Sequence, residues 1–105
     1  MNIEEISFKI ILHGGNARTL AMEAISHAKK DEYKDAKQKL EAANEEVNQA
    51  HQYQTDLIQG ETRGEKTEIR LLLVHAQDHL MNAMTVIDLA KEFVELYEKI
   101  YEKGN

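Results

Sequence analysis

Histidine is the residue type in this chain that is best suited to covalent or metal chemistry. The 105 residues contain no cysteine, no Walker-type phosphate loop and no GxGxxG motif, so thiolate and nucleotide-binding chemistry have no motif to use. The serines, Ser7 and Ser26, stand outside any nucleophile-elbow motif. The candidates that remain are the imidazoles of His13, His27, His51, His75 and His79.

His75 and His79 are spaced as one turn of a helix, with Asp78 between them. A neutral imidazole can attack a phosphoryl donor and hold the group as a phosphoramidate, and a nearby carboxylate would orient the ring. The same i, i+4 pair could instead ligate a metal ion. A purely structural role is the third alternative, and spacing alone leaves all three open.

The other three histidines are interpreted as structural. His13 and His27 fall on the apolar face of the first predicted helix, and His51 adjoins the apolar face of the second, beside Ala50. Histidines in such places pack or accept hydrogen bonds near a core more often than they react.

Composition and periodicity predict an all-α chain. Proline is absent, and Ala, Glu, Lys, Gln and Leu are abundant, which favours helix along most of the length. Apolar residues recur at spacings of three and four and predict helices over about 3–30, 31–59 and 67–103. These helices form a single domain, 1–105, and short connections favour antiparallel neighbours.

Glycines and polar residues mark the predicted breaks. The adjacent glycines Gly14 and Gly15 predict a kink, or a place where another backbone packs closely. Asp31 is expected to cap the second helix, and the polar stretch 60–64 is expected to be a loop. Thr67 is expected to cap the third helix.

The third predicted helix has two apolar faces. An inner stripe is wide enough to bury against the other two helices, and it comprises Ile69, Leu73, Ala76, Leu80, Ala83, Ile87, Ala90 and Val94. An outer stripe on nearly the opposite side comprises Leu71, Val74, Asp78, Met81, Thr85, Leu89 and Leu96. A lone bundle needs only the inner stripe, so the outer stripe predicts a homo-oligomer in which third helices pack on one another. Carboxylates of Asp78 gathered there would repel unless they were protonated or shared a divalent cation.

Charge narrows the possible partners. The formal net charge is −6 with both signs interspersed, which disfavours binding to nucleic acid and to an anionic membrane surface. The N-terminal region has only a brief apolar run, so we expect neither a signal peptide nor a membrane span, and a cytoplasmic protein.

The segment from Val74 to Met81 reads VHAQDHLM and resembles the active-site signature of the lactose/cellobiose family of IIA components of the sugar phosphotransferase system. Further pieces resemble the family in order: Gly15-Asn-Ala-Arg18, Ala50-His51 with Gln54, and Leu57-Ile-Gln59. The similarity spans all 105 residues.

The resemblance implies an antiparallel three-helix bundle that assembles as a homotrimer, with the third helices around the axis. It implies that His75 is the phosphorylated residue, on Nε2, and that His79 is an accessory residue that tunes or positions the site. It also implies that Asp78 lies at the trimer interface and binds a divalent cation of the Mg²⁺ type, one per trimer.

The resemblance further implies a phosphotransferase component that works through a phosphohistidine. The donor would be the histidine phosphocarrier protein HPr, and the acceptor a cysteine of the cognate IIB domain, with IIC in the membrane. Such a carrier touches neither the sugar nor the bilayer. The alternatives are a helical metal-binding oligomer without covalent chemistry and a helical adaptor that uses the outer stripe for a foreign helix.

Overall fold

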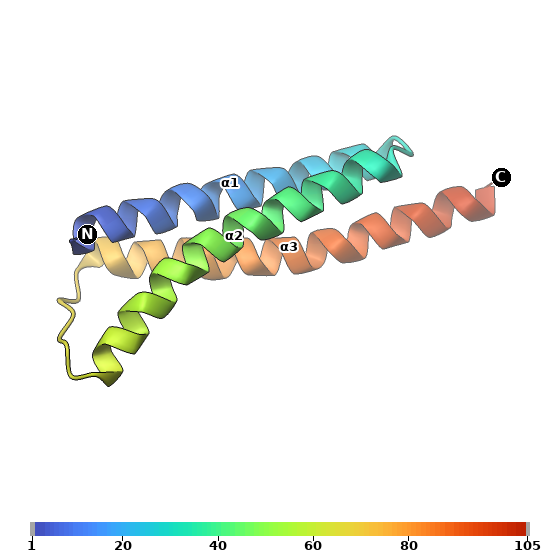
Figure 1. Ribbon diagram of the computed structural model, residues 1–105. Helices are drawn as coiled ribbons and strands as arrows, with labels where there is room; N and C mark the ends of the chain where they lie inside the picture. Colours follow the sequence, from blue (N-terminus) through green and yellow to red (C-terminus); the bar gives the residue numbers. More distant parts are fainter. Residues whose placement is uncertain (1, 105) are drawn as a thin grey trace.

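A computed structural model describes residues 2–104, and three long helices make up most of them. They are α1 (Ile3–Lys29), α2 (Tyr33–Thr62) and α3 (Leu71–Gly104). The chain runs up, down and up along an elongated bundle of 59 × 20 × 18 Å (Figure 1). The predicted all-α antiparallel three-helix bundle is therefore confirmed. None of the described helices has an apolar stretch long enough to cross a bilayer.

The core lies along the inner face of α3. Its buried positions alternate large and small side chains at spacings of three and four, and they are Leu73, Ala76, Leu80, Ala83, Ile87, Ala90 and Val94. That alternation lets side chains of neighbouring helices interdigitate. The inner stripe of the sequence analysis is confirmed at every position except Ile69, which precedes the helix and is 81% exposed.

Small residues on the buried face of α1 allow α3 to come close. Alanines at 17, 21, 24 and 28 follow Gly14 along that face. A Cβ atom added at Gly14 would lie 3.5 Å from the backbone carbonyl carbon and oxygen of His79. Close backbone packing is thus the observed outcome at Gly14, and α1 continues as one helix through both glycines.

The turn between α1 and α2 differs from the prediction that Asp31 caps the second helix. Asp31 lies in the turn itself with a left-handed φ of 60°, a conformation that aspartate tolerates better than most residues. Glu32 occupies the N-cap position of α2. Its carboxylate turns back toward α1, where Oε1 lies 2.7 Å from Nδ1 of His27.

The second connection also differs from the prediction. α2 continues through Gly60 to Thr62, so the expected loop over 60–64 begins late, and the chain crosses to α3 over 63–70. Thr67 lies within this crossing and does not cap α3, which begins at Leu71. The physical reason is visible in Figure 1: the last turns of α2 diverge from α1 and α3, so an extended segment must span the gap.

Candidate functional site

His75 and His79 face each other on α3. Their Nε2 atoms lie 3.0 Å apart, and the two rings are nearly perpendicular, at 84°, with centroids 4.5 Å apart. His75 is exposed and His79 is half-buried. At 3.0 Å one Nε2 donates a proton and the other accepts it. When His79 is the donor, Nε2 of His75 is unprotonated and keeps the lone pair that a nucleophile requires.

The histidine pair is held on a rigid part of the bundle. Ala76 and Leu80, which alternate with the two histidines along α3, are fully buried. The backbone of His79 packs against Gly14 of α1, so the pair lies on the edge of α3 that faces α1. Side chains on a packed helix keep their position better than side chains on a loop.

Two surface hollows adjoin the pair. One of about 420 Å³ is lined by Leu71, Leu72 and His75. The other, of about 370 Å³, lies between α1 and α3, and its lining residues are Gly14, Arg18, His79, Asn82, Thr85 and Val86. Both hollows are open to solvent.

Asp78 lies on the outer stripe, where the sequence placed it. It is exposed, and the side-chain amide of Asn82 donates a 3.4 Å hydrogen bond to its Oδ2. Val74 and Met81 beside it are 52% and 53% exposed in the single chain. Within residues 2–104, no cluster of three metal-ligating side chains includes Asp78.

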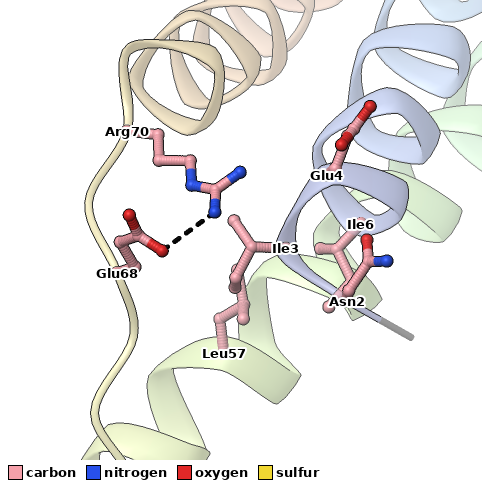
Figure 2. Close-up of a pocket in the computed structure, with 7 residues that line it drawn as sticks. All are labelled: Asn2, Ile3, Glu4, Ile6, Leu57, Glu68 and Arg70. Carbon is pink, nitrogen blue, oxygen red and sulfur yellow. Dashed lines mark hydrogen bonds and ion pairs between the residues drawn. The ribbon is translucent and has the colours of Figure 1, made fainter.

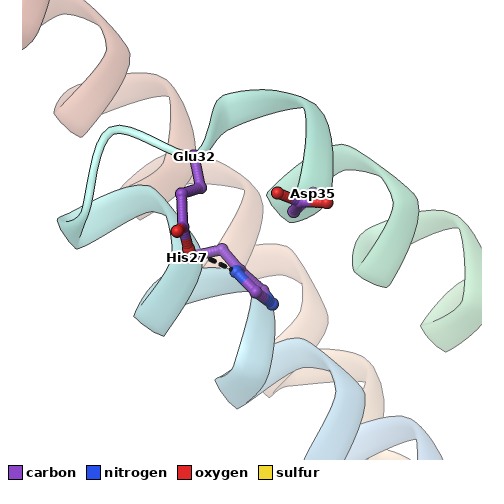
Figure 3. Close-up of side chains that lie close together, drawn as sticks. All are labelled: His27, Glu32 and Asp35. Carbon is purple, nitrogen blue, oxygen red and sulfur yellow. Dashed lines mark hydrogen bonds and ion pairs between the residues drawn. The ribbon is translucent and has the colours of Figure 1, made fainter.

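A different cluster of potential metal ligands lies at the α1–α2 turn. Ligand atoms of His27, Glu32 and Asp35 lie within 4.8 Å of one another (Figure 3). His27 and Glu32 already pair at 2.7 Å and close the turn. The pairing gives His27 a structural role in the turn, as expected for this residue.

His13 and His51 lie away from the pair. Nδ1 of His13 lies 2.6 Å from Oε2 of Glu46 on α2, and its ring stacks on Tyr53. This contact ties α1 to α2, in line with the structural interpretation. His51 is exposed, and its Nδ1 lies 3.5 Å from the hydroxyl of Thr55. It therefore does not pack on the buried face of α2.

A further hollow, of about 480 Å³, lies at the end of the bundle where α1 begins. Figure 2 shows its lining, which comprises Asn2, Ile3, Glu4, Ile6, Leu57, Glu68 and Arg70. Arg70 donates a 3.0 Å hydrogen bond to Glu68 and thereby holds the pKa of that carboxyl below its ordinary value. A carboxylate kept ionised and paired in this way is a poor general base. The histidine pair is therefore the better candidate for chemistry.

Sequence reasoning did not identify two places where residues of α3 meet side chains of the other helices. Arg18 was noted only as part of a family motif, yet it shares a hollow with His79. Gln54 was likewise noted as part of a family motif, yet its side-chain amide donates a 2.6 Å hydrogen bond to Oε1 of Gln77 on α3.

Comparisons with known proteins converge on one family. The family described as "PTS system, Lactose/Cellobiose specific IIA subunit" matches residues 5–98. The chain is 62% identical over 101 residues to the lichenan-specific phosphotransferase enzyme IIA component of Bacillus subtilis, covering 96% of this chain and 92% of that relative.

Solved structures of IIA proteins are also similar to this chain. The crystal structure of the cellobiose-specific enzyme IIA from Bacillus anthracis superposes with a TM-score of 0.93 at 53% identity, over 98% of this chain and 95% of that one. A chain from the solution structures of the IIA(Chitobiose)–HPr complex of Escherichia coli gives a TM-score of 0.82 at 38% identity. The match covers 96% of this chain and 98% of that chain.

Proposed function

The chain belongs to the lactose/cellobiose-specific IIA subunit family of the phosphotransferase system, and from that premise we propose that it carries the phosphoryl group on Nε2 of His75. As a member of this family it is a phosphotransferase component of sugar transport. The observation that carries the residue assignment is the exposed imidazole of His75, whose Nε2 lies 3.0 Å from Nε2 of His79 on a packed helix.

The proposed donor is HPr, because the similar Escherichia coli IIA(Chitobiose) was solved in complex with HPr. The lone pair on Nε2 of His75 attacks phosphorus, the bond between phosphorus and the donor imidazole breaks, and its electron pair returns to the donor ring. Such transfers depend mostly on in-line positioning and on stabilisation of charge on the phosphoryl oxygens. In the tautomer in which Nε2–H of His79 donates a hydrogen bond to Nε2 of His75, that bond breaks to free the lone pair, and the same N–H can then donate a hydrogen bond to a phosphoryl oxygen.

The proposed acceptor is a cysteine of the cognate IIB component, with IIC carrying the sugar across the membrane. The thiolate sulfur attacks phosphorus, and the electron pair of the P–N bond returns to Nε2 of His75. The carrier works in the cytoplasm and needs contact with neither sugar nor bilayer. A carrier that meets two partners in turn must release each quickly, which suits an open surface site with weak to moderate affinity.

We further propose a homotrimer with α3 helices around the axis. Large apolar side chains along the outer face of α3 are about half exposed or more in the single chain, namely Leu71, Val74, Met81, Leu89, Phe93, Leu96 and Ile100. An apolar surface that follows one helix face over its whole length is typical of an interface between subunits. His75 borders this face, so packing of neighbouring chains would place it at the rim of a crevice.

Asp78 is the proposed ligand of a divalent cation of the Mg²⁺ type at the trimer axis. Three symmetry-related carboxylates would supply oxygen ligands, which hard divalent cations prefer. The donor set fits, since Asp78 lies on the outer face and Asn82 adds an amide beside it. When bound, the cation would neutralise like charges and thereby stabilise the assembly.

Incorporation of phosphate from phosphoenolpyruvate tests the assignment. The wild-type protein, incubated with the general phosphotransferase proteins, should acquire an acid-labile label. His75→Ala should abolish it, His79→Ala should retain some, and His51→Ala, which removes an exposed histidine elsewhere, should label fully. Full labelling of His75→Ala would reject the proposal.

A further inference from the structure

Arg18 is placed beside the histidine pair by the packing of α1 on α3. It follows Gly14 by one helical turn, and Gly14 is where the backbones of the two helices come close. Arg18 lines the hollow of about 370 Å³ together with His79 and Asn82 of α3. A cationic side chain thus shares a surface hollow with one member of the proposed reactive pair.

Arg18 has no counter-ion among the residues that the structure describes. Across residues 2–104, no carboxylate forms an ion pair with Arg18, although the chain has a net charge of −6. The other two arginines do pair, Arg63 with Glu65 at 3.5 Å and Arg70 with Glu68 at 3.0 Å. An unpaired guanidinium at the edge of an otherwise acidic protein is available to an anionic ligand.

The geometry of the histidines indicates where such an anion would lie. Nε2 of His75 points at Nε2 of His79 across 3.0 Å. A phosphorus atom bonded to Nε2 of His75 needs the space that Nε2 of His79 occupies here, so the two rings must move apart, and the phosphoryl oxygens would then lie next to His79. Because His79 lines the hollow that contains Arg18, those oxygens would lie at the edge of the same hollow.

We propose that Arg18 binds the phosphoryl group while His75 carries it, an inference that rests on the function proposed above. A phosphoryl group carries close to two negative charges at neutral pH, and the planar guanidinium fork matches two of its oxygens. Arg18 takes no part in bond making: the P–N bond forms and breaks at Nε2 of His75, and the guanidinium keeps its protons. Its contribution is to stabilise charge on the phosphoryl oxygens during both transfers.

Rapid-quench transfer from phosphorylated HPr tests this role. Arg18→Gln and Arg18→Met both remove the positive charge, and methionine keeps an apolar stem. Each variant should slow transfer at saturating donor by about ten- to hundredfold, which is the range expected for loss of one charge-assisted hydrogen bond. Arg18→Lys should recover part of the rate. Arg63→Gln is the matched control at an exposed arginine on another element and should transfer at the wild-type rate.

Phosphorus NMR titration of the phosphorylated proteins supplies a readout that a structural or docking role would not move. Loss of the guanidinium should raise the pKa of the phosphoryl group on His75, because a neighbouring cation favours its dianion. Wild-type transfer rates and an unchanged titration in both Arg18→Gln and Arg18→Met would overturn the inference. So would an effect confined to the donor concentration at half-maximal rate, which would make Arg18 a docking contact.

The two proposals fail in different ways. The carrier function fails when the wild-type protein acquires no label or when His75→Ala labels fully. The role of Arg18 fails when the wild type labels on His75 and charge removal at residue 18 changes neither the transfer rate nor the titration. Thermal unfolding of each variant checks that replacing the exposed side chain of Arg18 has left the bundle folded.

Discussion

The two faces of α3 are both apolar, yet only one is covered. On the inner face Leu80 is fully buried, whereas Leu89 on the outer face is 54% exposed. Both leucines sit in the same helix and carry the same side chain. The difference shows that the inner face belongs to the fold of one chain. The outer face is then available for assembly, and the histidine pair lies between the two.

Truncation of matched leucines separates the two faces most strongly. Leu80→Ala should lower the free energy of unfolding by about 2–5 kcal/mol at every protein concentration, because it leaves a cavity in the core. Leu89→Ala should change the unfolding of a dissociated chain little, and should lower apparent stability only where the oligomer is populated. Denaturant unfolding over a range of protein concentrations measures both effects. Equal, concentration-independent losses in the two variants would show that the faces do not differ in this way.

Replacing the one carboxylate of the outer stripe should sharpen the comparison. Asp78→Leu removes charges that would repel at the axis and adds apolar contact, so the proposed trimer should dissociate at a concentration lower by about tenfold or more. If the proposed cation bridges the Asp78 carboxylates, chelation of divalent cations should weaken the wild-type assembly and leave the variant unaffected. Sedimentation equilibrium reports both, and a monomeric Asp78→Leu would refute the placement of Asp78 at the interface.

The smallest expected effect concerns two adjacent glycines of α1. Apart from its own stretch of helix, a Cβ at Gly15 would meet nothing of the described residues within 4 Å, so Gly15→Ala should raise the free energy of unfolding by about 0.4–1 kcal/mol through helix propensity and unfolded-state entropy. At Gly14 the new methyl would rest against the backbone of His79 at 3.5 Å, so Gly14→Ala should gain less. Thermal unfolding of both variants decides the order, and a larger gain at Gly14 would contradict it.

Periodic parts of the fold were predictable, whereas the connections were not. The 3–4 spacing from Leu73 to Val94 identified the buried face, because helical periodicity directly reports which side is covered. Ile69 fits the same spacing but lies outside the helix, since α2 ends away from α3 and the chain needs 63–70 to cross. The local cap signal at Thr67 carries no information about that distance.

The candidate site was predictable in part for a similar reason. His75, Asp78 and His79 are close in sequence on one helix, so their relative placement followed from helical geometry. Arg18 comes from a different helix, and its place beside His79 depends on the depth at which α1 packs against α3 at Gly14. No single-helix pattern encodes that depth.

The central claim is that His75 carries the phosphoryl group on Nε2. Nitrogen-15 NMR of the histidine rings in the unaltered, phosphorylated protein tests it most directly, because a phosphorus coupling identifies both the residue and the ring nitrogen. The account predicts a single phosphorylated ring, that of His75, coupled through Nε2. Coupling at His79 or at any other histidine, or through Nδ1 of His75, would contradict it.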